Sequence, residues 1–81
     1  MTNAQKIIVY STPSCPYCKL AKEYLKSKNF TYEEIDVAAD SEKAEEMIQK
    51  SGQMGVPVIE IGETIIVGFD KPRINAALGI A

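Results

Sequence analysis

The sequence contains no histidine and no tryptophan, and only two of its 81 residues are cysteine. Without histidine, the chain lacks the Ser–His and Cys–His pairs of many hydrolases and the commonest ligand of zinc sites. Two cysteines are also too few for the disulfide framework of a small secreted domain. The two thiols are therefore the only obvious reagents that the sequence offers.

Charge of one sign and long hydrophobic runs are scarce as well. Nine basic and eleven acidic residues leave a formal net charge of -2, so no basic stripe suggests nucleic-acid binding. No apolar run approaches the ~18 residues of a membrane span, and residues 1–10 lack the features of a signal peptide. We therefore expect a soluble, cytoplasmic, monomeric protein with no membrane contact and a single domain over residues 1–81.

Hydrophobic periodicity and turn residues divide the chain into seven elements. Strands are predicted at residues 6–11, 32–37, 56–61 and 64–67. Helices are predicted from Pro16 to about Asn29, from Asp40 or Ser41 to Gly52, and from Asp70 to Leu78. This order, βαβ-α-ββ-α, predicts an α/β fold with a four-stranded mixed sheet, helices on both faces and the first two strands parallel.

Some of these elements also show which side chains face the core. In the first helix, the helical spacing predicts a buried face made of Leu20, Ala21, Tyr24 and Leu25, while Lys19, Lys22, Glu23 and Lys26 face water. The strand at 32–37 has three acidic residues among six, which is typical of an edge strand that avoids pairing with other chains.

The tetrad Cys15-Pro16-Tyr17-Cys18 stands where the first strand passes into the first helix. Cys15 is expected at the helix start, where unpaired N–H groups and the positive end of the helix dipole stabilise a thiolate. Cys18 shares that helix face but lies deeper. This arrangement predicts thiol–disulfide chemistry with Cys15 as nucleophile and Cys18 as resolving thiol, and an internal Cys15–Cys18 disulfide in the oxidised form.

Pro57 follows Val56 at the start of a predicted strand, where proline removes a ladder donor. One interpretation is an ordinary proline at a strand start. The other is a cis peptide bond that exposes the Val56 backbone beside the cysteines, so that a substrate peptide pairs with it.

Taken together, the tetrad, the Val56-Pro57 pair and the Gly68-Phe69-Asp70 segment resemble the glutaredoxin family of the thioredoxin-like fold. The resemblance implies a cis Pro57 and reduction of glutathione mixed disulfides or protein disulfides. It also implies a glutathione site, with glutathione as co-substrate and no bound cofactor or metal. The residues carried over to that site are Tyr17, Gln53, Val56, Pro57, Gly68, Phe69 and Asp70.

The sequence departs from the family pattern where basic residues often hold the glycine carboxylate of glutathione, because Thr12 and Met54 occupy those positions. This favours, as an alternative, a glutaredoxin-like redoxin that is recharged by thioredoxin reductase and serves ribonucleotide reductase. A further alternative is a [2Fe–2S]-binding module, in which Cys15 of two chains and two glutathione thiols hold the cluster.

Overall fold

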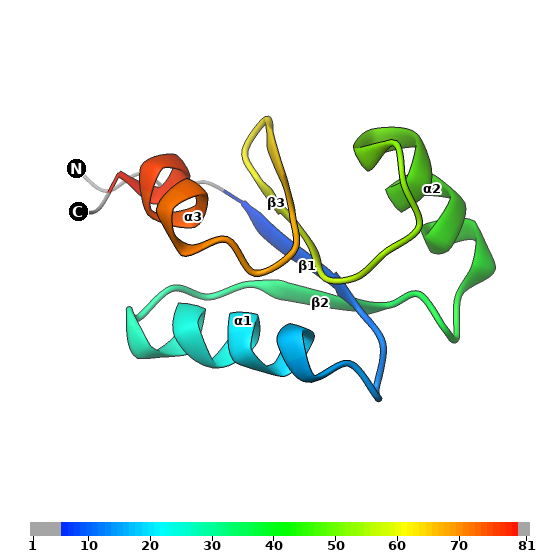
Figure 1. Ribbon diagram of the computed structural model, residues 1–81, viewed down its shortest axis with the longest axis horizontal. Helices are drawn as coiled ribbons and strands as arrows, with labels where there is room; N and C mark the ends of the chain where they lie inside the picture. The colour runs from blue at the N-terminus through cyan, green and yellow to red at the C-terminus, as the bar shows by residue number, and fades with distance from the viewer. Residues whose placement is uncertain (1–5, 80–81) are drawn as a thin grey trace.

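A computed structural model describes residues 6–79 of the chain and shows a four-stranded sheet with helices on both faces (Figure 1). The elements, in chain order, are β1 (Ile7–Ser11), α1 (Pro16–Ser27), β2 (Glu33–Asp36), α2 (Ser41–Ser51), β3 (Val58–Ile61), β4 (Thr64–Val67) and α3 (Lys71–Leu78). The sheet order is β2-β1-β3-β4, with β1 parallel to β2 and β3 antiparallel to both of its neighbours. The predicted fold class is therefore confirmed.

The ends of the strands differ slightly from the prediction. β3 begins at Val58, two residues later than expected, because Pro57 has no N–H to contribute to the ladder. The charged strand β2 lies at one edge of the sheet, as its composition predicts.

Two hydrophobic clusters hold the helices against the sheet. On one face, α1 and α3 pack on alternate strand residues; this cluster consists of Ile7, Val9, Ala21, Leu25, Ile59, Ile61, Ile66 and Ile74. On the other face, α2 packs on a smaller cluster built on Tyr10, Met47 and Val58. Figure 1 shows α2 and α3 on opposite sides of the central strands.

One prediction about the core was wrong. Leu20 was expected on the buried face of α1, but it is 45% exposed. The stripe that faces the sheet is Cys18, Ala21 and Leu25, a spacing of three and four residues. Leu20 lies about 100° away from Ala21 around the helix, on a flank that the described residues leave partly exposed.

The helix ends follow the sequence signals. Asp40 caps α2 and accepts the Lys43 N–H at 3.2 Å, while Asp70 caps α3 and accepts the Arg73 N–H at 3.3 Å. Asn29 adopts a left-handed conformation with φ 66° just after α1.

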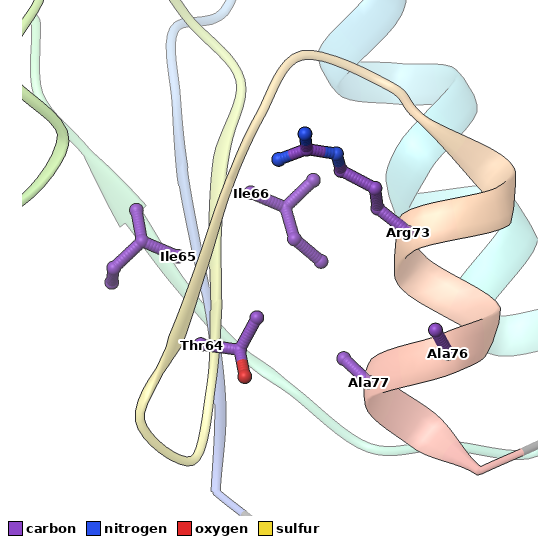
Figure 2. Close-up of a pocket in the computed structure, with 6 residues that line it drawn as sticks. All are labelled: Thr64, Ile65, Ile66, Arg73, Ala76 and Ala77. Atoms are coloured by element: carbon purple, nitrogen blue, oxygen red, sulfur yellow. The ribbon is translucent and has the colours of Figure 1, made fainter.

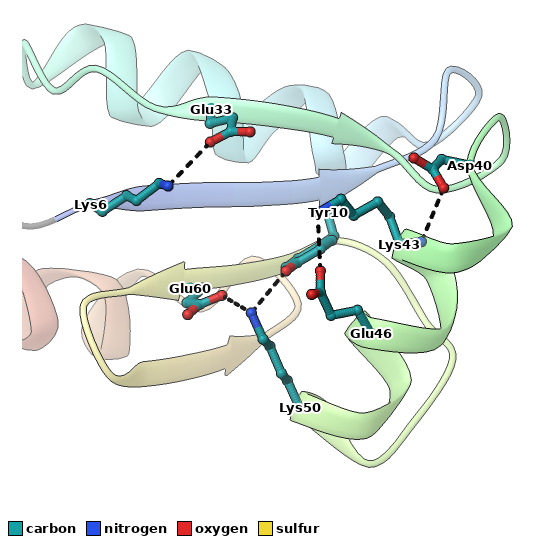
Figure 3. A network of polar contacts seen from close by, with 8 residues as sticks. All are labelled: Lys6, Tyr10, Glu33, Asp40, Lys43, Glu46, Lys50 and Glu60. Carbon is teal, nitrogen blue, oxygen red and sulfur yellow. Dashed lines mark hydrogen bonds and ion pairs between the residues drawn. The ribbon is translucent and has the colours of Figure 1, made fainter.

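A polar contact ties α2 to the sheet. The Lys50 ammonium donates to the Glu60 carboxylate at 2.8 Å and to the Tyr10 hydroxyl at 3.2 Å (Figure 3). These two bonds, the first to Glu60, raise the pKa of Lys50 above its ordinary value. Residues 6–79 include no helix that is long and apolar enough to cross a bilayer.

Candidate active site

The loop between β1 and α1 places Cys15 at the helix N-terminus. The Cys15 N–H donates to the Thr12 carbonyl at 3.3 Å, which closes a tight turn before the helix. Cys15 is the N-cap residue of α1, and its Sγ accepts the Cys18 N–H at 3.1 Å. The first turn of α1 carries no acidic residue. The Cys15 sulfur therefore lies at the positive end of the helix dipole, with a backbone N–H directed at it.

Cys18 has a different environment, although it is only three residues further along. Its side chain is 0% exposed, whereas Cys15 is half-buried, and both are free thiols. Burial, followed by the contact with Cys15, raises the pKa of the Cys18 thiol from 9.0 to about 11, against smaller opposing effects of the Thr12 backbone and Lys22. Cys18 is therefore protonated at neutral pH, and its sulfur is shielded from water.

The loop before β3 reaches the first cysteine. The Cys15 Sγ lies 3.8 Å from the Val56 carbonyl oxygen, across 41 positions of sequence. The Val56–Pro57 bond is cis, as predicted. The Pro57 carbonyl accepts the Gly68 N–H at 2.8 Å, so the segment after β4 is held against the same loop. Gly68 has φ +83°, a conformation that favours glycine.

The structure thus brings Cys15, Cys18, Val56, Pro57 and Gly68 together. Tyr17, the next residue of the tetrad after Pro16, projects into solvent with 62% of its surface exposed. The rings of Phe69 and Tyr24 meet edge-on at 5.9 Å, so Phe69 is anchored to α1.

Two of the expected ligand-binding side chains already have partners within the protein. The Gln53 amide bonds both backbone groups of Gly55, accepting the N–H at 2.6 Å and donating to the carbonyl at 3.0 Å. The Asp70 carboxylate caps α3 and lies 3.6 Å from the Arg73 guanidinium. Gln53 therefore orders the loop before Val56. Its side-chain carbonyl oxygen would lie only 2.7 Å from a Cβ atom added at Gly55, so a larger residue at position 55 would displace it.

Positive charge is scarce where the glycine carboxylate of glutathione is expected. Met54 is 76% exposed and carries no charge. The Lys71 ammonium lies 5.3 Å from the centre of the Tyr24 ring and 5.9 Å from that of Phe69, so it is held over these rings.

One charged group near the cysteines was missed in the sequence. Lys22, expected to face water, has only 22% of its side chain exposed and lies 2.6 Å from the Glu34 carboxylate of β2. This bond raises the pKa of Lys22 and lowers that of Glu34. Lys22 is one turn beyond Cys18 and its charge opposes the rise in the Cys18 pKa. The i, i+4 spacing of Cys18 and Lys22 was the feature of the sequence that could have predicted their proximity.

Across residues 6–79, no group of three or more His, Cys, Asp or Glu side chains is placed to hold a metal ion. The described geometry provides two thiols side by side, one partly exposed at a helix N-terminus and one buried beside it, an arrangement suited to thiol–disulfide exchange.

Known proteins are similar to this chain in sequence and in fold. The family model for glutaredoxin matches residues 7–66. A glutaredoxin-like 8.6 kDa protein from the rubredoxin operon of Clostridium pasteurianum is 55% identical over 69 residues, which cover 85% of this chain and 92% of that protein. Glutaredoxin 3 of Escherichia coli is 40% identical over 62 residues, covering 76% and 75% of the two chains.

Among solved structures, the glutaredoxin-like protein NrdH-redoxin from Escherichia coli superposes with a TM-score of 0.80 at 28% identity, covering 88% of this chain and 92% of that one. Its structure is described as the basis for a thioredoxin-like activity profile. The chain therefore belongs to the glutaredoxin family and is a thiol–disulfide oxidoreductase with the thioredoxin-like fold.

Proposed function

We propose that the protein is a dithiol glutaredoxin that reduces glutathione mixed disulfides and protein disulfides, with Cys15 as nucleophile, Cys18 as resolving thiol and glutathione as co-substrate. The contrast between the two sulfurs carries this proposal. Cys15 is accessible and accepts an N–H bond at the helix start, while Cys18 is buried with its pKa raised to about 11. The first sulfur is suited to begin an exchange reaction and the second to complete it.

On a glutathione mixed disulfide, the Cys15 thiolate attacks the glutathione sulfur. The S–S bond breaks, the protein thiolate leaves and takes up a proton, and a Cys15–glutathione disulfide forms. The thiolate of a second glutathione then attacks the glutathione sulfur of this adduct, which releases oxidised glutathione and restores the Cys15 thiolate. Cys18 takes no part in this route.

On a protein disulfide, the Cys15 thiolate forms a mixed disulfide with one substrate sulfur and the other leaves. Cys18 then loses its proton and attacks the Cys15 sulfur, so that the substrate is released reduced and the Cys15–Cys18 disulfide forms. Two electrons from two glutathione molecules return both cysteines to thiols.

For glutathione itself, we propose a site along the Val56 backbone, flanked by Tyr17, Gln53 and Pro57 on one side and by Gly68, Phe69 and Asp70 on the other. The position of the Val56 carbonyl, 3.8 Å from the Cys15 sulfur, supports pairing of the cysteinyl part with this loop. The Gln53 Nε2 donates one N–H to the Gly55 carbonyl at 3.0 Å, and its second N–H, which makes only a long 3.5 Å contact with the Ser51 hydroxyl, would serve a ligand carboxylate.

A second candidate is a redoxin that receives electrons from thioredoxin reductase and serves ribonucleotide reductase. The uncharged Thr12 and Met54 favour it, because they supply no cation at the two positions where the family often holds the glycine carboxylate of glutathione. The likeness to NrdH-redoxin supports the same candidate.

The deciding experiment measures turnover of a glutathionylated peptide and of a protein disulfide with each reducing system in parallel. The systems are glutathione with glutathione reductase, and thioredoxin reductase, both supplied with NADPH. Cys18→Ser is expected to retain activity on the glutathione adduct and to lose activity on the protein disulfide, while Cys15→Ser loses both. Turnover with thioredoxin reductase alone would replace the leading proposal by the second.

The absence of a positive charge at position 54 provides a further test. Met54→Lys is expected to lower the KM for the glutathione adduct about two- to fivefold, because an exposed ion pair contributes about 0.5–1 kcal/mol. Met54→Gln, of similar size and uncharged, is the matched control. An unchanged KM in Met54→Lys would argue against a glutathione carboxylate at this position.

A further inference from the structure

The two edges of the sheet differ in chemistry. The edge strand β2 carries Glu33, Glu34 and Asp36, and its side chains pair with Lys6 and Lys22. The opposite edge strand, β4, reads Thr-Ile-Ile-Val and carries no charge. Charged side chains on an edge strand discourage pairing with another chain, and an uncharged apolar edge leaves pairing open.

The register of the β3–β4 hairpin shows which backbone groups point outward. Gly68 donates its N–H to Pro57 of the neighbouring segment, and Val67 lies opposite Val58. Because hydrogen-bonded and non-hydrogen-bonded pairs alternate along an antiparallel ladder, Thr64 and Ile66 direct their backbone groups to β3. Ile65 and Val67 direct theirs to the open edge of the sheet.

A groove runs beside this edge, between β4 and α3. It has a volume of about 370 Å³ and is lined by Thr64, Ile65, Ile66, Arg73, Ala76 and Ala77. Figure 2 shows the Thr64 and Ile66 side chains on the α3 side of the strand, facing the two alanines, with the Arg73 guanidinium above Ile66. Ile66 itself is fully buried beneath the groove, so the apolar surface open to another side chain is that of Ala76 and Ala77.

The charge at the rim indicates what fits there. Arg73 is 73% exposed and its contact with Asp70 is long, at 3.6 Å, so its guanidinium is available to a second carboxylate. The groove thus offers outward backbone groups, an apolar floor and one cation at its rim.

We propose that the β4 edge and this groove form a docking site for an extended segment of a partner protein, which adds to the sheet as a fifth strand. One apolar side chain of the segment lies against Ala76 and Ala77, and one acidic side chain pairs with Arg73. A second copy of this chain fits less well. A four-residue strand buries far less than the roughly 1,200 Å² of a stable dimer interface, whereas a peptide segment binds transiently over a smaller area.

This site is separate from the thiols, and the proposal stands whichever reductant recharges Cys15. The β4 strand nevertheless ends beside the loop that contacts Cys15, since Gly68 bonds Pro57. A partner segment docked along β4 is therefore anchored at one side of the reactive sulfur.

The test is an NMR titration of the isotope-labelled reduced protein with a cysteine-free octapeptide of alternating valine and threonine that carries one central glutamate. On binding, the Ile65 and Val67 amides are expected to shift and to exchange more slowly with solvent. The Thr64 and Ile66 amides, already bonded within the sheet, are expected to change less. No shift at Ile65 and Val67, or shifts centred on another face, would overturn the proposal.

Reversing the charge at position 73 tests the role of the Arg73 guanidinium. Arg73→Glu is expected to weaken the glutamate peptide about five- to tenfold and to favour a matched peptide with lysine at the same position. Lys26→Glu, an identical charge change on the exposed side of α1, serves as control and is expected to change neither affinity. Equal affinity of both peptides for the parent protein and for Arg73→Glu would refute an acidic partner.

Proline tests the backbone pairing. Val67→Pro removes an N–H that points to the open edge, so the fold is expected to persist while peptide affinity falls about fivefold. Unchanged affinity in a folded Val67→Pro protein would contradict strand addition. Doubling of the mass with protein concentration, with Ile65 and Val67 shifted before peptide is added, would assign the edge to a second copy and reject our choice of occupant.

Discussion

The raised pKa of Cys18 predicts that the internal resolution step depends steeply on pH. A thiol with a pKa of about 11 is ionised in about one molecule in ten thousand at pH 7, and each pH unit changes that fraction tenfold, or 1.36 kcal/mol. Once Cys15 is bound in a mixed disulfide, the raising effect of its thiolate disappears, but burial of Cys18, the larger cause, persists. We therefore expect the rate of attack by Cys18 to rise close to tenfold per unit from pH 6 to 8.

Stopped-flow spectroscopy with a chromogenic aromatic disulfide measures this step directly. The first equivalent of coloured thiolate reports attack by Cys15, and its rate depends on reagent concentration. The second equivalent reports attack by Cys18 on the adduct, and its rate is independent of concentration. Cys18→Ser, the control, is expected to lack the second phase. A second phase whose rate is flat between pH 6 and 8 would refute the inference that burial keeps Cys18 protonated.

Three further predictions concern stability, measured by urea unfolding. Leu25→Ala is expected to lower the free energy of unfolding by about 2–5 kcal/mol, because Leu25 is 0% exposed. Leu20→Ala, at a 45% exposed position, is expected to lower it by less than about 1 kcal/mol. Equal losses for the two variants would contradict the observed buried face of α1. Asp40→Ala is expected to cost about 1 kcal/mol through loss of the α2 cap, and a loss near zero would show that Lys43 N–H needs no partner there. In the reduced protein, Cys18 ionises in the unfolded chain at a lower pH than in the folded one, so the folded state binds more protons between pH 9.0 and about 11. Stability is expected to fall across that window by on the order of 2 kcal/mol, and this fall is expected to shrink in Cys18→Ala.

Local signals in the sequence predicted most of the fold. Helix starts are marked by Asp40 and Asp70, whose carboxylates each accept a backbone N–H three residues further on. A helix end is marked by Asn29, because asparagine tolerates the left-handed backbone conformation found there. The acidic composition of the strand at 32–37 identified an edge strand for a similar reason, since a run of charged side chains discourages pairing with a further strand.

The errors arose where the outcome depends on distant parts of the chain. Leu20 fits the helical periodicity of an apolar face, but its side of α1 is left 45% exposed by the part of the chain that the structure describes. Lys22 has the polarity of a surface residue, yet it pairs with Glu34 of β2 and only 22% of its side chain is exposed. Contacts of this kind join residues whose proximity exists only after the sheet has formed.

The site shows the same division. The sequence by itself determined the reagents, two thiols with the spacing of a redox pair, and the helix start that favours charge on the first. The sequence also indicated that Cys18 lies deeper than Cys15 and that the Val56 backbone lies beside the cysteines. Only the tertiary structure decided that the Cys18 side chain is 0% exposed, that the Val56 carbonyl oxygen lies 3.8 Å from the Cys15 sulfur, and that Lys71 lies over two aromatic rings. The degree of desolvation and the distances between residues dozens of positions apart depend on how the whole chain packs, which no local pattern specifies.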